Sequence, residues 1–146
     1  MAETSNLDQD ILDDLAHYTH HGLQLIGVDE NSPPEQIVRS ITEYVRELKT
    51  RGDVPQEDDV LGLGILLGQQ YVRGFAWRWA RVVWDGDADN DAIGVLPQDD
   101  SLFINPMWWM NDTVSTDRST NFMLNYNMVA ANKIPPATPG EAMGFH

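Results

Sequence analysis

The chain has 146 residues, 42% of them hydrophobic and five of them tryptophan, which is sufficient for one domain with a buried core. Nine basic residues face 23 acidic ones, and the formal net charge of -14 repels phosphate backbones and anionic lipids, so we expect neither nucleic acid nor a membrane as a partner. No cysteine is present, which excludes disulfides, thiolate nucleophiles and cysteine-ligated metals.

Two amphipathic helices are predicted in the first third of the chain. From Leu7 to about His21, apolar residues recur at spacings of three and four, and Gly22 is the expected end of this helix. The second helix has Ser32 as its expected N-cap and Glu35 three residues later, which together form a capping-box pattern. Its apolar stripe stops shortly before a glycine, which predicts the C-terminus there.

A third helix is predicted to open at Pro55 and to be buried in the centre of the fold. Its body, residues 60–72, is apolar on almost every face, as expected for a helix that other elements surround. Gly64 and Gly68 lie four apart on one face, where glycine lowers helix stability. We therefore expect another backbone to approach this face closely, and we expect Gly74 to end the helix.

The pattern then changes to alternation, which predicts a three-stranded antiparallel meander. Residues 76–84 are aromatic and β-branched with alternating charges, as is typical of a strand. The Asp-rich residues 85–91 have the composition of a turn. Residues 92–96 are the second expected strand, and residues 101–104 are the third.

The C-terminal part is predicted to be helical and to finish in a tail. Pro106 begins one helical segment, and Ser119 or Thr120 is the expected cap of the last helix. From residue 135 onward, three prolines and two glycines predict an extended chain. The sequence therefore predicts one α+β domain over residues 1–134, in which the N-terminal helices pack on the meander, and a Pro/Gly-rich tail over residues 135–146.

One set of motifs lies between residues 60 and 110. It consists of Leu61-Gly62-x-Gly64-x-x-Leu67-Gly68, then Trp77-x-Trp79, then an acidic turn, then Ser101-Leu102-Phe103-Ile104-Asn105-Pro106. These motifs resemble a family of short bacterial domains of unknown function, which share an LGxxLG helix, a tryptophan-containing strand and a hydrophobic strand that ends in proline. The resemblance implies a helix followed by a sheet, and it implies no catalytic residue.

The acidic turn is a candidate calcium site, because hard cations bind several carboxylates in one loop. The turn carries four alternating aspartates, Asp85, Asp87, Asp89 and Asp91. It departs from the calcium-loop pattern at two positions, because Asn90 stands where glycine is needed and Leu96 where a bidentate glutamate is needed. We therefore interpret the turn as a solvated hairpin tip.

A histidine cluster at the end of the first predicted helix is a second candidate for metal binding. His17, His20 and His21 are spaced by three and four residues, so a helix places their imidazoles near one another. The helix lacks the His-Glu-x-x-His pattern of zinc proteases. Surface histidines at a helix C-terminus are the simpler interpretation, because partial positive charge is favourable there.

The motifs of common enzyme classes are missing from the sequence. No serine stands in a Gly-x-Ser-x-Gly elbow, and the glycines of residues 62–68 follow no strand and precede no lysine. In a chain with 23 acidic residues, any pair of carboxylates is uninformative about glycosidase chemistry. We expect no cofactor, and an enzymatic function has no positive motif in its favour.

The aromatic residues divide into two groups. Trp77 and Trp79 are expected to pack the sheet against the third helix. Trp108 and Trp109 are adjacent in one short helix, so both cannot face its core, and one is expected to be partly exposed. Exposed tryptophans are frequent anchors of protein interfaces.

Charge and exposed aromatics together favour a non-enzymatic domain that binds a basic protein. The expected partner-binding residues are Trp108, Trp109, Asp85, Asp87 and Asp89. A concrete form of this hypothesis is an immunity protein that neutralises a basic toxin, and because the N-terminus lacks a basic or apolar leader, we expect it in the cytoplasm. The alternative is a small hydrolase or ligand-binding domain with a carboxylate-lined pocket.

Overall fold

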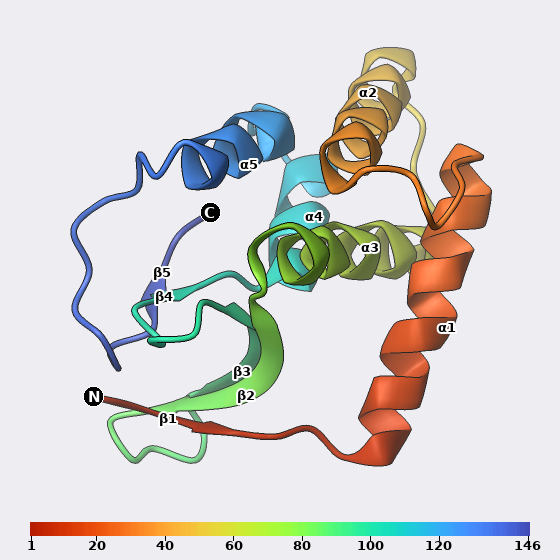
Figure 1. Cartoon of the computed structure of the whole chain (residues 1–146). Helices are drawn as coiled ribbons and strands as arrows, with labels where there is room; N and C mark the ends of the chain where they lie inside the picture. The colour runs from red at the N-terminus through yellow and green to blue at the C-terminus, as the bar shows by residue number, and fades with distance from the viewer.

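A computed structural model describes all residues, 1–146, and confirms the predicted α+β class. Its elements in chain order are β1 (Ala2–Ser5), α1 (Gln9–Ile26), α2 (Pro34–Arg51), α3 (Glu57–Phe75), β2 (Arg78–Trp84), β3 (Asp91–Leu96), β4 (Leu102–Phe103), α4 (Pro106–Ser115), α5 (Phe122–Ala130) and β5 (Met143–Gly144). Helices α1, α2 and α4 and the sheet surround α3, and α5 lies beside α2 (Figure 1). No helix has both the length and the apolar composition needed to cross a membrane.

Helix α3 forms the centre of the core, as its apolar sequence predicts. Leu63, Leu66, Leu67 and Tyr71 are fully buried, and they belong to one hydrophobic cluster with side chains of α2, the sheet, α4 and α5. The Tyr71 hydroxyl donates a hydrogen bond to the side-chain oxygen of Asn125 at 2.6 Å, so its polar group is satisfied inside the core. The middle of this helix, from Gly62 to Gly68, is buried throughout, which explains why this part of its sequence has no polar face.

Glycines let two helices cross α3 at short range. A Cβ added to Gly22 of α1 would lie 2.6 Å from the carbonyl oxygen of Gly62, so these two backbones are almost in contact. A Cβ added to Gly64 would lie 2.8 Å from the carbonyl oxygen of Pro106 at the start of α4. The predicted close approach of a backbone is therefore confirmed at Gly64, whereas the space beside Gly68 is filled by side chains of Pro106 and Trp79.

The sheet contains three antiparallel strands in the order β1-β2-β3. The residue partners include Ala2 with Trp84 and Arg78 with Leu96. The sequence predicted residues 101–104 as the third strand of this sheet. In the structure, β1 is the third strand of the sheet. Instead, β4 pairs with β5 in parallel, and a single bridge between Val95 and Ile104 joins this pair to β3.

The predicted end of the second helix at Gly52 is confirmed, whereas the predicted end of the first helix and the predicted N-cap of the second are wrong. Gly22 lies inside α1, which continues to Ile26 and ends at Gly27 in the left-handed conformation. Gly22 lies where α1 crosses α3. The glycine lets the two helices pack closely, and it does not end α1. Helix α2 begins at Pro34 with Pro33 as its N-cap residue, and no side chain caps it, so Ser32 does not take the expected role.

The later helix ends also differ from the expectation. Gly74 lies within α3, whose last residue is Phe75 and whose C-cap residue, Ala76, has a φ of 57°. The Tyr126 hydroxyl fills the space beside Gly74, which explains the glycine by packing. Asn121 occupies the N-cap position of α5 in place of Ser119 or Thr120, and its side chain makes no capping bond.

Both predicted sheet tryptophans pack against α3. The Trp77 ring lies 5.3 Å from the Tyr71 ring, measured between centroids. The Trp79 indole donates a hydrogen bond to the Gln69 side chain at 3.0 Å. These contacts confirm that the start of the sheet is attached to the central helix through aromatic side chains.

The C-terminal tail is extended and returns to the body of the molecule. Its strand β5 pairs with β4, and the Phe145 amide donates to the Phe103 carbonyl at 2.9 Å. The His146 ring then packs edge-on against Trp108 and Trp109, at centroid distances of 5.4 and 5.9 Å. The last residues therefore cover part of helix α4.

Candidate interaction surface

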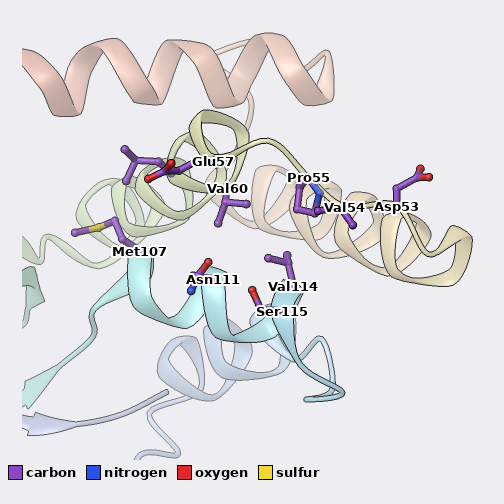
Figure 2. Close-up of a pocket in the computed structure, with 10 residues that line it drawn as sticks. Asp53, Val54, Pro55, Glu57, Val60, Met107, Asn111, Val114 and Ser115 are labelled. Atoms are coloured by element: carbon purple, nitrogen blue, oxygen red, sulfur yellow. The ribbon is translucent and has the colours of Figure 1, made fainter.

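The largest hollow of the surface lies between α3, α4 and the loop that joins α2 to α3, and we call it the α3–α4 groove (Figure 2). Its volume is about 600 Å³, which lies within the range of ligand-binding sites. Five of its ten lining residues are hydrophobic, so its lining is apolar and polar in similar measure. The lining residues are Asp53, Val54, Pro55, Glu57, Val60, Leu61, Met107, Asn111, Val114 and Ser115.

The start of α4 positions one wall of the groove. The Asn105 side chain accepts a hydrogen bond from the Trp108 amide at 3.0 Å, and Pro106 occupies the first turn, so the sequence sets the helix start by two local signals. From there, Met107, Asn111 and Val114 follow at spacings of four and three, which places them on one face. Figure 2 shows this face turned toward α3 and Pro55.

The groove lies to one side of the contact between α3 and α4. The two helices are closest at Gly64 and Pro106, where a Cβ would not fit. The lining residues Glu57, Val60 and Leu61 precede Gly64 in α3, so the groove extends from this contact toward the N-terminus of α3. Glycine thus fixes the helices at one end of the groove, and larger side chains line the other.

The α2–α3 loop and the first residue of α3 form an apolar and acidic rim. Gly52 ends α2 in the left-handed conformation, and Val54 follows with 90% of its surface exposed. Asp53 accepts a hydrogen bond from the Arg51 guanidinium at 2.9 Å, whereas Glu57 forms no ion pair. The rim therefore offers one uncompensated carboxylate, that of Glu57, and one exposed valine, Val54.

Acidic groups next to the groove raise the pKa of two tyrosines. The carboxylate of Asp58 raises the pKa of Tyr18 on the neighbouring helix α1. Burial, followed by the charge of Asp59, raises the pKa of Tyr44 on α2. In both cases negative charge disfavours the phenolate, so the start of α3 carries a negative field.

The structure gives the two candidate tryptophans different environments. Trp108 is 53% exposed, and it stands three residues before Asn111, so it is a surface neighbour of the groove without lining it. Trp109 is fully buried, where its ring lies 5.0 Å from the Phe122 ring. Only Trp108 is accessible to a partner.

The three candidate aspartates lie far from these tryptophans, in the turn between β2 and β3 (Figure 1). Asp85, Asp87 and Asp89 are exposed. Asp85 contacts the N-terminal ammonium group at 3.2 Å, and Asp87 accepts a hydrogen bond from the Asp89 amide at 3.0 Å. The expected partner-binding residues are therefore not brought together in one place.

The candidate metal ligands are also separated. His21 forms a 2.7 Å contact with Asp59, while His17 and His20 are exposed on α1. In the acidic turn, Asp91 binds Arg81 at 2.7 Å instead of facing the other aspartates. The structure places no three histidine, aspartate or glutamate side chains where they could share a metal ion.

Almost all basic side chains are bonded within the chain. Five arginines form ion pairs with carboxylates, namely Arg39, Arg51, Arg78, Arg81 and Arg118. Three more basic side chains donate to backbone carbonyls, namely Arg46, Lys49 and Arg73. The acidic groups greatly outnumber these partners, so the surface charge of the molecule is set by carboxylates that have no cation beside them.

Sequence reasoning missed the groove. Its floor and rim come from residues more than 50 positions apart, such as Val54 and Val114, and no local pattern joins them. One signal was available, because Val54 is an apolar residue between a helix-ending glycine and a proline, in a loop where polar residues are usual.

No protein-family model, curated protein or solved structure matches the chain. The resemblance of residues 60–110 to a family of short bacterial domains therefore stays a prediction.

Proposed function

We propose that the chain is a non-enzymatic interaction domain that binds a basic protein, in the manner of an immunity protein that neutralises a basic toxin. The observation that carries the proposal is the charge balance of the surface. The basic groups of the molecule are almost all used in internal bonds, whereas many carboxylates are exposed without a cation beside them.

This imbalance has an energetic consequence. Like charges on one surface repel each other, so surplus carboxylates lower the stability of the free domain. A basic partner removes this repulsion when it binds, and the same field attracts the partner over distances of about a Debye length, roughly 8 Å at 0.15 M salt. Exposed apolar side chains, such as Val54 and Trp108, supply contact area that charge alone does not.

The proposal is tested by affinity capture with the tagged chain at low and at high salt. We expect a partner of basic isoelectric point, whose purified form binds in calorimetry and whose affinity falls as salt rises from about 50 to about 300 mM. For the immunity-protein form, expression of the partner alone should stop cell growth and coexpression of the chain should restore it. Capture of no basic protein, or an affinity that salt does not change, would contradict the proposal.

The second candidate is a hydrolase or ligand-binding domain that uses a carboxylate-lined pocket. It is supported by the volume of the α3–α4 groove and by the two carboxylates in its lining, Asp53 and Glu57. Asp53 is already bonded to Arg51, which leaves Glu57 as the free acidic group. Saturable binding of an uncharged small molecule in the groove, without any basic protein partner, would favour this candidate.

A further inference from the structure

We infer that the α3–α4 groove is the docking site for a basic amphipathic helix of the partner, an inference that rests on the proposed function. The helix would place apolar side chains over Val60, Met107 and Val114 and a lysine or arginine beside Glu57. The groove would thus make the specific contacts with the partner. The rest of the acidic surface would attract the partner without selecting a particular segment of it.

The walls of the groove determine the secondary structure of its occupant. The long walls of the groove are helices α3 and α4, whose central backbone groups are bonded within each helix, and the loop residues Asp53, Val54 and Pro55 close one end. No strand lines the groove. An extended peptide would find few backbone partners along these helices, so most of its own N–H and C=O groups would be buried without hydrogen bonds, which is unfavourable. A helix satisfies its own backbone and enters such grooves with one apolar face.

The floor of the groove suits apolar side chains of varied shape. Val60 is buried, and Leu61, Met107 and Val114 are half-buried, so a ligand that covers them removes apolar surface from water. Met107 is flexible and polarisable, which lets the floor adapt to different side chains. The cavity of about 600 Å³ has room for a few side chains, as one or two turns of a helix present them.

The rim sets the charge of the occupant. Glu57 forms no ion pair, and the start of α3 adds the carboxylates of Asp58 and Asp59 to its field. A second copy of the chain is a poor occupant, because it carries the same net charge of -14. The C-terminal tail is already paired with β4, so it does not reach the groove. Charge complementarity therefore selects a partner segment with lysine or arginine beside its apolar stripe.

The test uses the full chain and two synthetic 18-residue peptides of leucine and lysine. In the first, the leucines recur at spacings of three and four, and in the second the same residues are scrambled so that no apolar face forms. We expect the first peptide to bind more tightly and to shift the amide NMR signals of groove residues, chiefly those of Val60, Met107 and Val114. The scrambled peptide measures attraction by charge alone.

Two pairs of matched variants locate the site. Glu57→Gln should weaken binding of the amphipathic peptide by about 2- to 5-fold, the range of one exposed ion pair, and Asp87→Asn makes the same charge change at the hairpin tip. Met107→Lys should weaken it by about tenfold or more, because it puts a charge on the apolar floor. Its control, Leu124→Lys, changes an apolar side chain that is 61% exposed on α5. Circular dichroism checks that each variant is folded.

The results separate this inference from the proposed function. If both control variants weaken binding as much as the groove variants, or if NMR shifts lie outside the groove, the inference is wrong while an acidic interaction domain remains supported. If the two peptides bind equally, the groove does not select an amphipathic helix, and the inference is equally overturned. If affinity capture instead finds no basic protein, or a partner whose affinity does not depend on salt, the proposed function itself is wrong.

Discussion

The imidazole of His146 is packed where a positive charge is unfavourable. It contacts the rings of Trp108 and Trp109, and its Nδ1 atom is buried without a hydrogen-bond partner. Burial, followed by the charge of Arg118, lowers the pKa of His146 to about 4, although Asp112 acts in the opposite direction. Protonation therefore opposes the docking of the C-terminal tail.

This arrangement predicts a loss of stability in mild acid. Between pH 6.5 and 4 the unfolded chain takes up a proton on His146 before the folded chain does, so stability present above pH 6.5 is lost as the pH falls toward 4. Because the ring is only partly buried, we expect a loss of about 1–2 kcal/mol in place of the full linkage value. His146→Gln should flatten the fall in melting temperature between pH 6.5 and 4.5.

The control for this prediction is the exposed His17, because His17→Gln removes an imidazole that is not packed in this way. An NMR titration gives the direct measurement, since each histidine ring has its own carbon-bound proton signals. A midpoint for His146 near 6.5, the ordinary value, would contradict the described packing of the tail.

Single residues also show what could be predicted from sequence. The partial exposure of one tryptophan in the 108–109 pair followed from their adjacency, and Trp108 is the exposed one. The glycines at 22 and 74 were misread as helix ends, because a glycine at a crossing and a glycine at a terminus look the same in one sequence. The groove was missed for a different reason, since Val54 and Val114 meet only in the tertiary structure.

At the scale of elements, periodicity predicted every helix and the strands β2 and β3 to within a few residues. Strand β1 was missed because Ala2–Ser5 contains neither aromatic residues nor a long alternation, and its pairing with β2 comes from distant contacts. Strand β5 consists of Met143–Gly144, which is too short for any pattern. Pairing between distant segments therefore accounts for the two strands that the sequence did not predict.

The crossing of α1 over α3 predicts the effect of a small substitution. Alanine normally stabilises a helix relative to glycine by about 0.5–1 kcal/mol. Gly22→Ala should do the opposite and destabilise the domain by about 1–2 kcal/mol, because overpacking at such a contact exceeds the helix gain. The added Cβ would lie 2.6 Å from the Gly62 carbonyl oxygen, and backbone atoms cannot move aside as a flexible side chain can. Urea denaturation measures the change.

Gln24→Ala is the matched control, because Gln24 is exposed on the same helix and its replacement changes helix propensity alone. We expect this variant to differ from the parent by less than about 0.5 kcal/mol. If Gly22→Ala were more stable than the parent, the two backbones would not cross at Gly22 and Gly62, and the packing of α1 would have to be revised.

For the whole molecule, the surplus of carboxylates predicts that salt stabilises the free domain. The net charge of -14 produces self-repulsion that folding concentrates in a smaller volume. Raising sodium chloride from about 10 to about 150 mM shortens the Debye length from roughly 30 to roughly 8 Å, which screens carboxylates that lie far apart. The internal ion pairs are screened as well, but most are exposed and contribute little, about 0–1 kcal/mol each.

We therefore expect the melting temperature at pH 7 to rise over this range of salt. The double variant Asp87→Asn/Asp89→Asn should have a higher melting temperature at low salt and a smaller rise of melting temperature with salt, because it removes two charges from an exposed turn. An asparagine at position 87 can still accept the hydrogen bond from the backbone amide of residue 89, so the turn is kept. A series in sucrose, which is uncharged, separates screening from general effects of the cosolute. A melting temperature that falls with salt would mean that the internal ion pairs stabilise the domain by more than the repulsion between carboxylates destabilises it. In that case the surplus carboxylates would not lower the stability of the free domain, and a basic partner would have no repulsion to relieve.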